Sequence, residues 1–90
     1  MIYSQPSFTR RYKKLLSRDR ERVDVAVARL LEGFGRPHLH SGAGIRPFGR
    51  YFELRAGLGL RVLFLPEDGD IFLMCVGDHN EIRNYVRGSP

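Results

Sequence analysis

The hydrophobic positions in the first third of the chain recur with the period of amphipathic helices. Spacings of three and four residues place each apolar set on one side of a helix. The two sets are Phe8, Tyr12, Leu15 and Leu16, then Val23, Val27, Leu30, Leu31 and Phe34. Pro6 suits the first turn of the first helix, Asp19 is the expected cap of the second, and Gly33 with Gly35 ends it. The pattern predicts a helical hairpin whose apolar side covers another element.

The period changes to two in the second half of the chain. Residues 35–47 are rich in glycine and proline and are expected to form a loop. Alternating runs then cover residues 51–56 and 60–65, and a three-residue loop between them would set Arg55 opposite Arg61. Residues 71–76 are apolar throughout, which is typical of a central strand, and they follow Asp68-Gly69, a type I′ hairpin signal. Three hairpin-linked strands are predicted.

The two ends of the chain complete the predicted domain. Residues 3–8 could open as a short edge strand. Near the other end, Asp78 and Glu81 have the spacing of a capping box, followed by a short helix with Ile82, Tyr85 and Val86 on one side. The expected fold is therefore one α+β domain over residues 1–90: an N-terminal helical hairpin packed on an antiparallel sheet of three to four strands, with a short C-terminal helix.

Length and composition exclude several classes of protein. A chain of 90 residues supports one core, and its single cysteine excludes an internal disulfide and a cysteine-rich zinc site. No apolar run approaches the ~20 residues of a membrane span, and the N-terminus has no signal-peptide pattern. We expect no membrane association and a reducing cytoplasm as the compartment.

The charge points to an anionic partner. The net charge is +5, and 13 of the 15 basic residues are arginines, whose planar donor fork suits phosphates. Residues 1–50 carry a net charge of +7, whereas residues 51–90 carry −2. Such a distribution is typical of a nucleic-acid-binding or acidic-protein-binding domain, and also of an arginine-rich solvated surface.

Two residues stand out as candidates for chemistry. Arg61 lies in the middle of a predicted strand, where it forms either a diagonal pair with Glu53 or a clamp for a phosphate. His79 directly follows the predicted cap Asp78, so it is either a surface residue or a proton-exchanging group beside a helix N-terminus that favours anions. Tyr85 reaches the same side or packs its helix on the sheet. No cofactor motif is present, and His38, His40 and His79 form only a weak alternative metal site.

The order of these segments resembles the RelE/ParE superfamily of toxin–antitoxin toxins over nearly the whole chain. The resemblance is carried by "PSFTRRYKKL", "HLHSG", the hairpin "GRYFELRAGLGLRVLF" and the strand-to-helix junction "VGDHNEI". The junction is closer to the RNase branches, RelE and YafQ-like, than to the gyrase-poisoning ParE branch. The resemblance implies metal-independent, cofactor-free cleavage of mRNA, usually on the ribosome, which leaves a 2′,3′-cyclic phosphate. It also implies an acidic cognate antitoxin and a bacterial or archaeal cytoplasm.

The resemblance also implies roles for individual residues. Arg61 would stabilise charge on the scissile phosphate, His79 would protonate the leaving oxygen, and Tyr85 would orient the RNA. RelE carries lysines on the first long strand, where this chain has Glu53, which is either the base or a structural partner of Arg55 or Arg61. The remaining expected RNA-binding residues are His40, Arg46, Arg55, Arg10, Arg11, Lys13 and Lys14. A non-catalytic gyrase inhibitor and a non-catalytic binding relic of the fold are the alternative functions.

Overall fold

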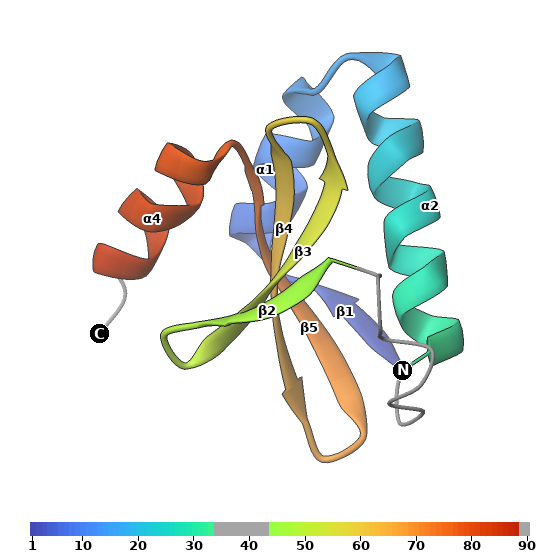
Figure 1. Ribbon diagram of the computed structural model, residues 1–90, viewed down its shortest axis with the longest axis vertical. Helices are drawn as coiled ribbons and strands as arrows, with labels where there is room; N and C mark the ends of the chain where they lie inside the picture. The colour runs from blue at the N-terminus through green and yellow to red at the C-terminus, as the bar shows by residue number, and fades with distance from the viewer. Residues whose placement is uncertain (34–43, 89–90) are drawn as a thin grey trace.

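The computed structural model describes residues 1–33 and 44–88, which form three helices and one sheet. The helices are α1 (Pro6–Lys14), α2 (Ser17–Gly33) and α4 (His79–Arg87). The strands are β1 (Ile2–Ser4), β2 (Ile45–Phe48), β3 (Tyr51–Gly57), β4 (Leu60–Glu67) and β5 (Asp70–Gly77). The order across the sheet is β1-β5-β4-β3-β2 (Figure 1). The expected α+β class is confirmed.

The three central strands follow the predicted hairpins. β3 and β4 pair antiparallel with Arg55 opposite Arg61, as the alternation requires, and β4 pairs antiparallel with β5. The turn between β4 and β5 has positive φ angles at Asp68 (52°) and Gly69 (83°), the backbone that a type I′ turn needs. Turn chemistry and the alternating pattern therefore agree on the register of this part of the sheet.

Each edge of the sheet carries one further strand. β1 runs parallel to β5, with Ile2 opposite Ile71, so the sheet is mixed and has five strands. β2 pairs antiparallel with β3 and occupies residues at the end of the expected loop. Pro47 interrupts the residue pattern by which a strand is recognised in this segment. The structure tolerates this proline because β2 is an edge strand, whose outer side need not donate a hydrogen bond to another strand.

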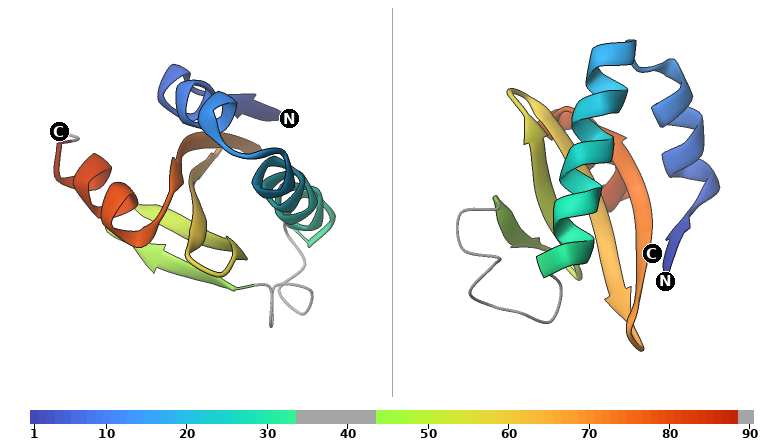
Figure 2. Two further views of the ribbon diagram at one scale, coloured as in Figure 1. Left: turned by 90° about the horizontal axis from the view of Figure 1, so that it is seen from above. Right: turned by 90° about the vertical axis from the view of Figure 1, so that its right-hand side faces the viewer.

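The sheet lies between α1 and α2 on one side and α4 on the other (Figure 2), and each side has its own hydrophobic cluster. The helix-side core lies under α1 and α2 and contains Phe8, Val23, Ala26, Leu30, Leu54, Leu60, Val62, Phe64, Ile71, Leu73 and Val76. The α4-side core lies on the opposite face and contains Tyr51, Leu63, Cys75 and Ile82, with Tyr85 and Val86 packed against it. Successive side chains of β3 and β4 thus point to opposite faces of the sheet and lie on the sides of different cores.

The helical hairpin differs in detail from its predicted apolar faces. α2 begins at Ser17, two residues before the expected cap Asp19, and its buried stripe is Val23, Ala26, Leu30 and Gly33. Leu16 and Leu31, expected on the buried faces, are exposed. α1 already ends at Lys14, so Leu16 lies between the helices, and the buried stripe of α2 extends from Val23 and Leu30 towards Ala26, which leaves Leu31 on the exposed side. Phe34 lies outside the described residues.

The junction between β5 and α4 has the predicted capping box. The Glu81 backbone N–H donates to the Asp78 carboxylate (2.8 Å), and the Asp78 N–H donates to Glu81 Oε1 (3.0 Å). Arg11 of α1 donates to Glu81 Oε2 (2.6 Å) and so connects α1 to the start of α4. A Cβ at Gly77 would lie 3.0 Å from the Glu81 side chain, so the close approach of strand and helix requires glycine there. Among the described helices, none is long and apolar enough to cross a membrane.

Burial raises the pKa of the Cys75 thiol, with a smaller lowering effect from Arg11. Because the thiolate is the reactive form, we expect iodoacetamide to label Cys75 slowly in the folded protein at pH 8 and rapidly in denaturant, with Cys75→Ala as the unlabelled control. The pKa of the Cys75 thiol is therefore higher in the folded than in the unfolded protein. The contribution of this thiol to the free energy of unfolding is fully present below the usual thiol pKa and is lost as pH rises through the pKa of the folded state. Equal labelling rates in the two states, measured by mass spectrometry, would contradict this.

Candidate functional site

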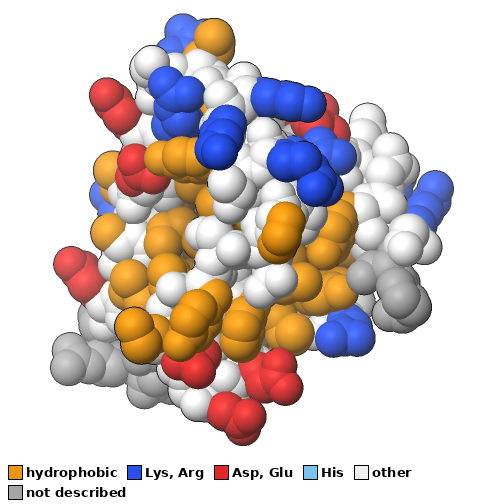
Figure 3. Space-filling model, turned by 180° about the vertical axis from the view of Figure 1, so that it is seen from behind, with side chains coloured by type: hydrophobic (Ala, Val, Ile, Leu, Met, Phe, Trp, Pro, Cys, Tyr) orange, Lys and Arg blue, Asp and Glu red, His pale blue; other side chains and the backbone are white. Residues whose placement is uncertain are grey.

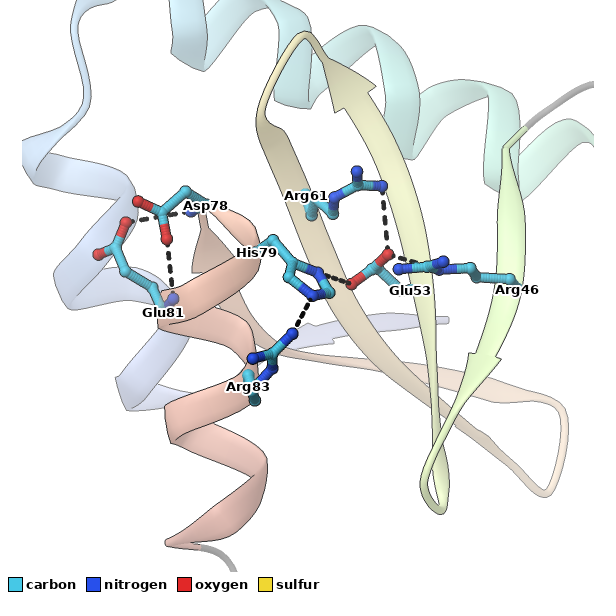
Figure 4. Close-up of polar contacts among 7 residues, drawn as sticks. All are labelled: Arg46, Glu53, Arg61, Asp78, His79, Glu81 and Arg83. Atoms are coloured by element: carbon cyan, nitrogen blue, oxygen red, sulfur yellow. Dashed lines mark hydrogen bonds and ion pairs between the residues drawn. The ribbon is translucent and has the colours of Figure 1, made fainter.

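A carboxylate lies inside the sheet on the α4 side. Glu53 of β3 is directly opposite Arg46 of β2, and it is opposite Leu63 of β4, one diagonal step from Arg61. Arg46 Nε donates to Glu53 Oε1 (2.9 Å), and Arg61 Nη1 donates to the same oxygen (3.2 Å) (Figure 4). The diagonal pair predicted for Arg61 and Glu53 is present, and Arg46 makes it a three-residue cluster.

His79, the first residue of α4, faces this cluster from the end of β5. Its Nδ1 lies 3.9 Å from Glu53 Oε2, and its Nε2 lies 2.8 Å from Nη2 of Arg83, one helical turn along α4 (Figure 4). The Phe48 ring packs edge-on against the imidazole, with ring centroids 6.1 Å apart. We call Arg46, Glu53, Arg61, His79 and Arg83 the Glu53 cluster; it draws on β2, β3, β4 and α4.

Exposure divides the cluster into buried and reachable groups. The Glu53 side chain is 1% exposed, and its Oε2 has no hydrogen-bond partner within the described residues. The Arg61, His79 and Arg46 side chains are 20%, 38% and 55% exposed. A bound molecule would therefore meet guanidinium groups and an imidazole, whereas Glu53 is covered. Fixed cations beside a group that exchanges protons suit an anionic substrate such as a phosphodiester.

Two further residues of the predicted site, Tyr85 and Arg55, lie outside the Glu53 cluster. Tyr85 packs in the α4-side core, with its ring 6.4 Å from that of Tyr51, so it holds α4 on the sheet. Arg55 is exposed and lines a separate groove of about 660 Å³ between α2 and β3, away from Glu53. Arg18, Arg22 and Arg29 of α2 also line that groove, together with Glu21.

The predicted RNA-binding residues of α1 lie on the other side of the sheet. Arg10, Lys13 and Lys14 are exposed, whereas Arg11 is engaged with Glu81. Seen from behind, Lys and Arg side chains gather towards the upper end of the molecule, where some carboxylates also lie, and hydrophobic side chains cover the surface below them (Figure 3). His40 lies outside the described residues.

The structure adds two contacts that the sequence reasoning missed. Arg46 was expected to bind RNA, but its pairing with Glu53 depends on a strand that was not predicted. Arg83 was not singled out, although its spacing of four residues from His79 places both on one face of a helix. Within residues 1–33 and 44–88, no three His, Cys, Asp or Glu side chains come together as a metal site, and His38 and His40 of the alternative metal site lie outside those ranges.

Comparison with solved structures identifies the fold. No protein-family model and no curated protein sequence matches the chain. YafQ from Escherichia coli matches with a TM-score of 0.73 at 15% identity, over 91% of this chain and 96% of YafQ. The RelB–RelE antitoxin–toxin complex of Methanococcus jannaschii gives 0.70 at 15%, over 92% and 96%. The YoeB–YefM complex of Staphylococcus aureus gives 0.64 at 18%, over 88% and 95%. The chain thus shares the fold of these solved toxin structures, as expected from the resemblance.

Removing the charge of Glu53 should destabilise the protein more than removing an exposed carboxylate. Glu53→Gln keeps the shape but leaves the Arg61 guanidinium without its anion, so we expect a loss of about 1–3 kcal/mol in the free energy of unfolding. Glu67→Gln, at the exposed end of β4, is the matched control and should change it by less than about 0.5 kcal/mol. Denaturant titration followed by circular dichroism measures both, and equal effects would show that the buried pairing is unimportant.

Proposed function

We propose that the protein is the toxin of a type II toxin–antitoxin system and that it cleaves ribosome-bound mRNA. The observation that carries the proposal is the convergence of Arg61 and His79 at the Glu53 cluster, on the sheet face that α1 and α2 leave free. The RelE-superfamily fold supports the toxin class, because the fold neighbours include toxins in complex with antitoxins. The proposed target is reached in the cytoplasm of a bacterium or archaeon.

The proposed reaction is an internal transfer within the RNA. The ribose 2′-oxygen forms a bond to the adjacent phosphorus as the bond from phosphorus to the 5′-oxygen breaks, which leaves a 2′,3′-cyclic phosphate. The 2′-hydroxyl loses a proton and the leaving 5′-oxygen gains one. Because the nucleophile is the 2′-hydroxyl, DNA is not a substrate.

Each residue of the cluster has a proposed part in this reaction. Arg61 stabilises the additional negative charge on phosphorus-bound oxygens, which is the role of preorganised donors in such transition states. His79 exchanges the proton, since its ring is reachable and an imidazole nitrogen can both accept and donate a proton. Glu53 is covered and is therefore the structural partner that orients Arg61, whereas Arg46 makes a second ion pair with Glu53 and extends the cationic surface.

The proposed partner is an acidic antitoxin. The net charge of +5 favours an acidic chain, and the groove between α2 and β3 offers Arg18, Arg29 and Arg55, which make no ion pair within the described residues. Apolar lining from Val25, Ala56 and Leu54 suits a segment that carries both carboxylates and apolar side chains.

The first test of this function separates a fixed charge from proton transfer. Arg61→Ala should slow cleavage of ribosome-bound mRNA by about 10²–10³-fold, and His79→Ala by about 10²–10⁴-fold. Only the histidine variant should flatten one limb of the pH–rate profile, because arginine does not titrate in the working range. Rates are measured over pH 5.5–9 by primer extension on translated mRNA.

Arg87→Ala is the matched control, since Arg87 is exposed at the last turn of α4 and no described residue pairs with it. Thermal unfolding of each variant separates lost chemistry from lost structure. Unchanged cleavage by a folded His79→Ala protein would show that His79 takes no part in the reaction, whereas a wild-type protein that does not cleave would favour a binding toxin, such as an inhibitor of gyrase, over the nuclease.

A second test addresses the antitoxin. Replacing Arg18 and Arg29 by serine should weaken binding of the antitoxin encoded beside the toxin by about tenfold at low salt, and the difference should shrink as salt screens the charges. Replacing Arg50 and Arg87 removes the same charge outside the groove and should have a smaller effect. Isothermal titration calorimetry measures both, and equal weakening would locate the antitoxin elsewhere.

A further inference from the structure

We propose that Arg83 fixes the tautomer of His79 and so makes Nε2 of that ring the atom that accepts the 2′-hydroxyl proton. The inference rests on the proposed function and deepens it, because it assigns the base of the reaction. Arg83 is a positioning residue here: it acts on the imidazole and does not itself take the proton.

The side chains of Arg83 and His79 are in direct contact. Arg83 Nη2 lies 2.8 Å from His79 Nε2, and the arginine is exposed on the same face of α4. A guanidinium has donors and no acceptor, so Nε2 must present its lone pair to Arg83. The neutral ring then carries its single proton on Nδ1. A proton on Nε2 would set two donors against each other at hydrogen-bond distance.

On the opposite side of the His79 ring lies the buried carboxylate of Glu53. Nδ1 faces Glu53 Oε2 at 3.9 Å, and that oxygen is buried without a hydrogen-bond partner in the described structure. An Nδ1–H directed at a carboxylate is favourable, whereas a bare Nδ1 lone pair would face its negative charge. Arg83 and Glu53 therefore select the same tautomer from opposite sides of the imidazole (Figure 4).

This tautomer determines what His79 does first. With Nε2 unprotonated, the ring accepts the proton of the 2′-hydroxyl as the 2′-oxygen attacks phosphorus, and the resulting imidazolium keeps Nδ1–H directed at the Glu53 carboxylate. The relation of carboxylate, imidazole and hydroxyl is that of a catalytic triad, in which the carboxylate orients the ring and stays ionised. The same Nε2 then returns its proton to the leaving 5′-oxygen, so proton and bonds balance. Arg83 must release Nε2 when substrate binds, which leaves its charge beside the phosphate.

The tautomer is measured directly by NMR of protein with ¹⁵N-labelled histidine, after a pH titration of the same signals has located the neutral form of the ring. His79→Ala identifies the His79 signals among those of the three histidines. We expect the wild-type ring to carry its proton on Nδ1, Arg83→Met to lose that preference, and Arg87→Met, one turn further along α4, to keep it. A wild-type ring protonated on Nε2, or an Nδ1 preference that survives in Arg83→Met, would overturn the proposal.

Cleavage of ribosome-bound mRNA tests the consequence for the reaction. Arg83→Met should lower the rate by about 10²-fold, as expected for a misplaced catalytic group, and Arg83→Lys should recover most of it because an ammonium also donates to Nε2. Arg87→Met should cleave like the wild type. A tautomer that changes without any loss of rate would overturn the role of Arg83. A wild-type protein that never cleaves would overturn the proposed function instead, while the NMR result would still establish the tautomer.

Discussion

The structure depends on the burial of one carboxylate, that of Glu53. A charge taken out of water is tolerated only when it is paired, and here one oxygen accepts hydrogen bonds from two arginines on the two neighbouring strands. The register of both strand pairs is therefore constrained by charge as well as by hydrophobic alternation. A shift of one residue along β3 would turn Glu53 towards the helix-side core, where the described residues are apolar, and would separate it from Arg46 and Arg61.

The two faces of the sheet are covered unequally, and Glu53 lies on the face that is covered less. α1 and α2 cover one face with a large apolar core, whereas α4 covers only part of the other (Figure 2). His79 reaches the Glu53 cluster because the chain turns sharply from β5 into α4, where Gly77 admits the Glu81 side chain and the capping box fixes the first turn. Arg11 on Glu81 connects this turn to α1, so the position of the imidazole depends on contacts from both sides of the sheet.

The sequence predicts the parts of this arrangement that depend on local patterns. Alternation and turn residues predict the three central strands and the register of β3 with β4, and the spacing of Asp78 and Glu81 predicts the start of α4. The pattern of β2 is short and interrupted by Pro47, so its pairing with β3 was not foreseen and Arg46 was not recognised as a partner of Glu53. Side-chain pairing within α4 has a sequence signal, the spacing of His79 and Arg83, but that spacing does not show that the histidine lies beside a buried carboxylate from another strand.

The charges around Glu53 connect the packing of the sheet to the chemistry proposed for it. Three guanidinium groups, those of Arg46, Arg61 and Arg83, surround one carboxylate and the His79 imidazole, and the guanidinium and carboxylate groups together leave a net charge of +2 in the cluster. The Glu53 carboxylate is buried, whereas the guanidinium groups are more exposed. The surface that a substrate meets is therefore more positive than the net charge of the cluster alone suggests. A phosphodiester gains negative charge as the 2′-oxygen attacks, and donors already held in place stabilise that charge without rearranging. The hydrogen bond and ion pair that stabilise the buried carboxylate of Glu53 therefore also hold the Arg61 guanidinium in position at the surface of the sheet.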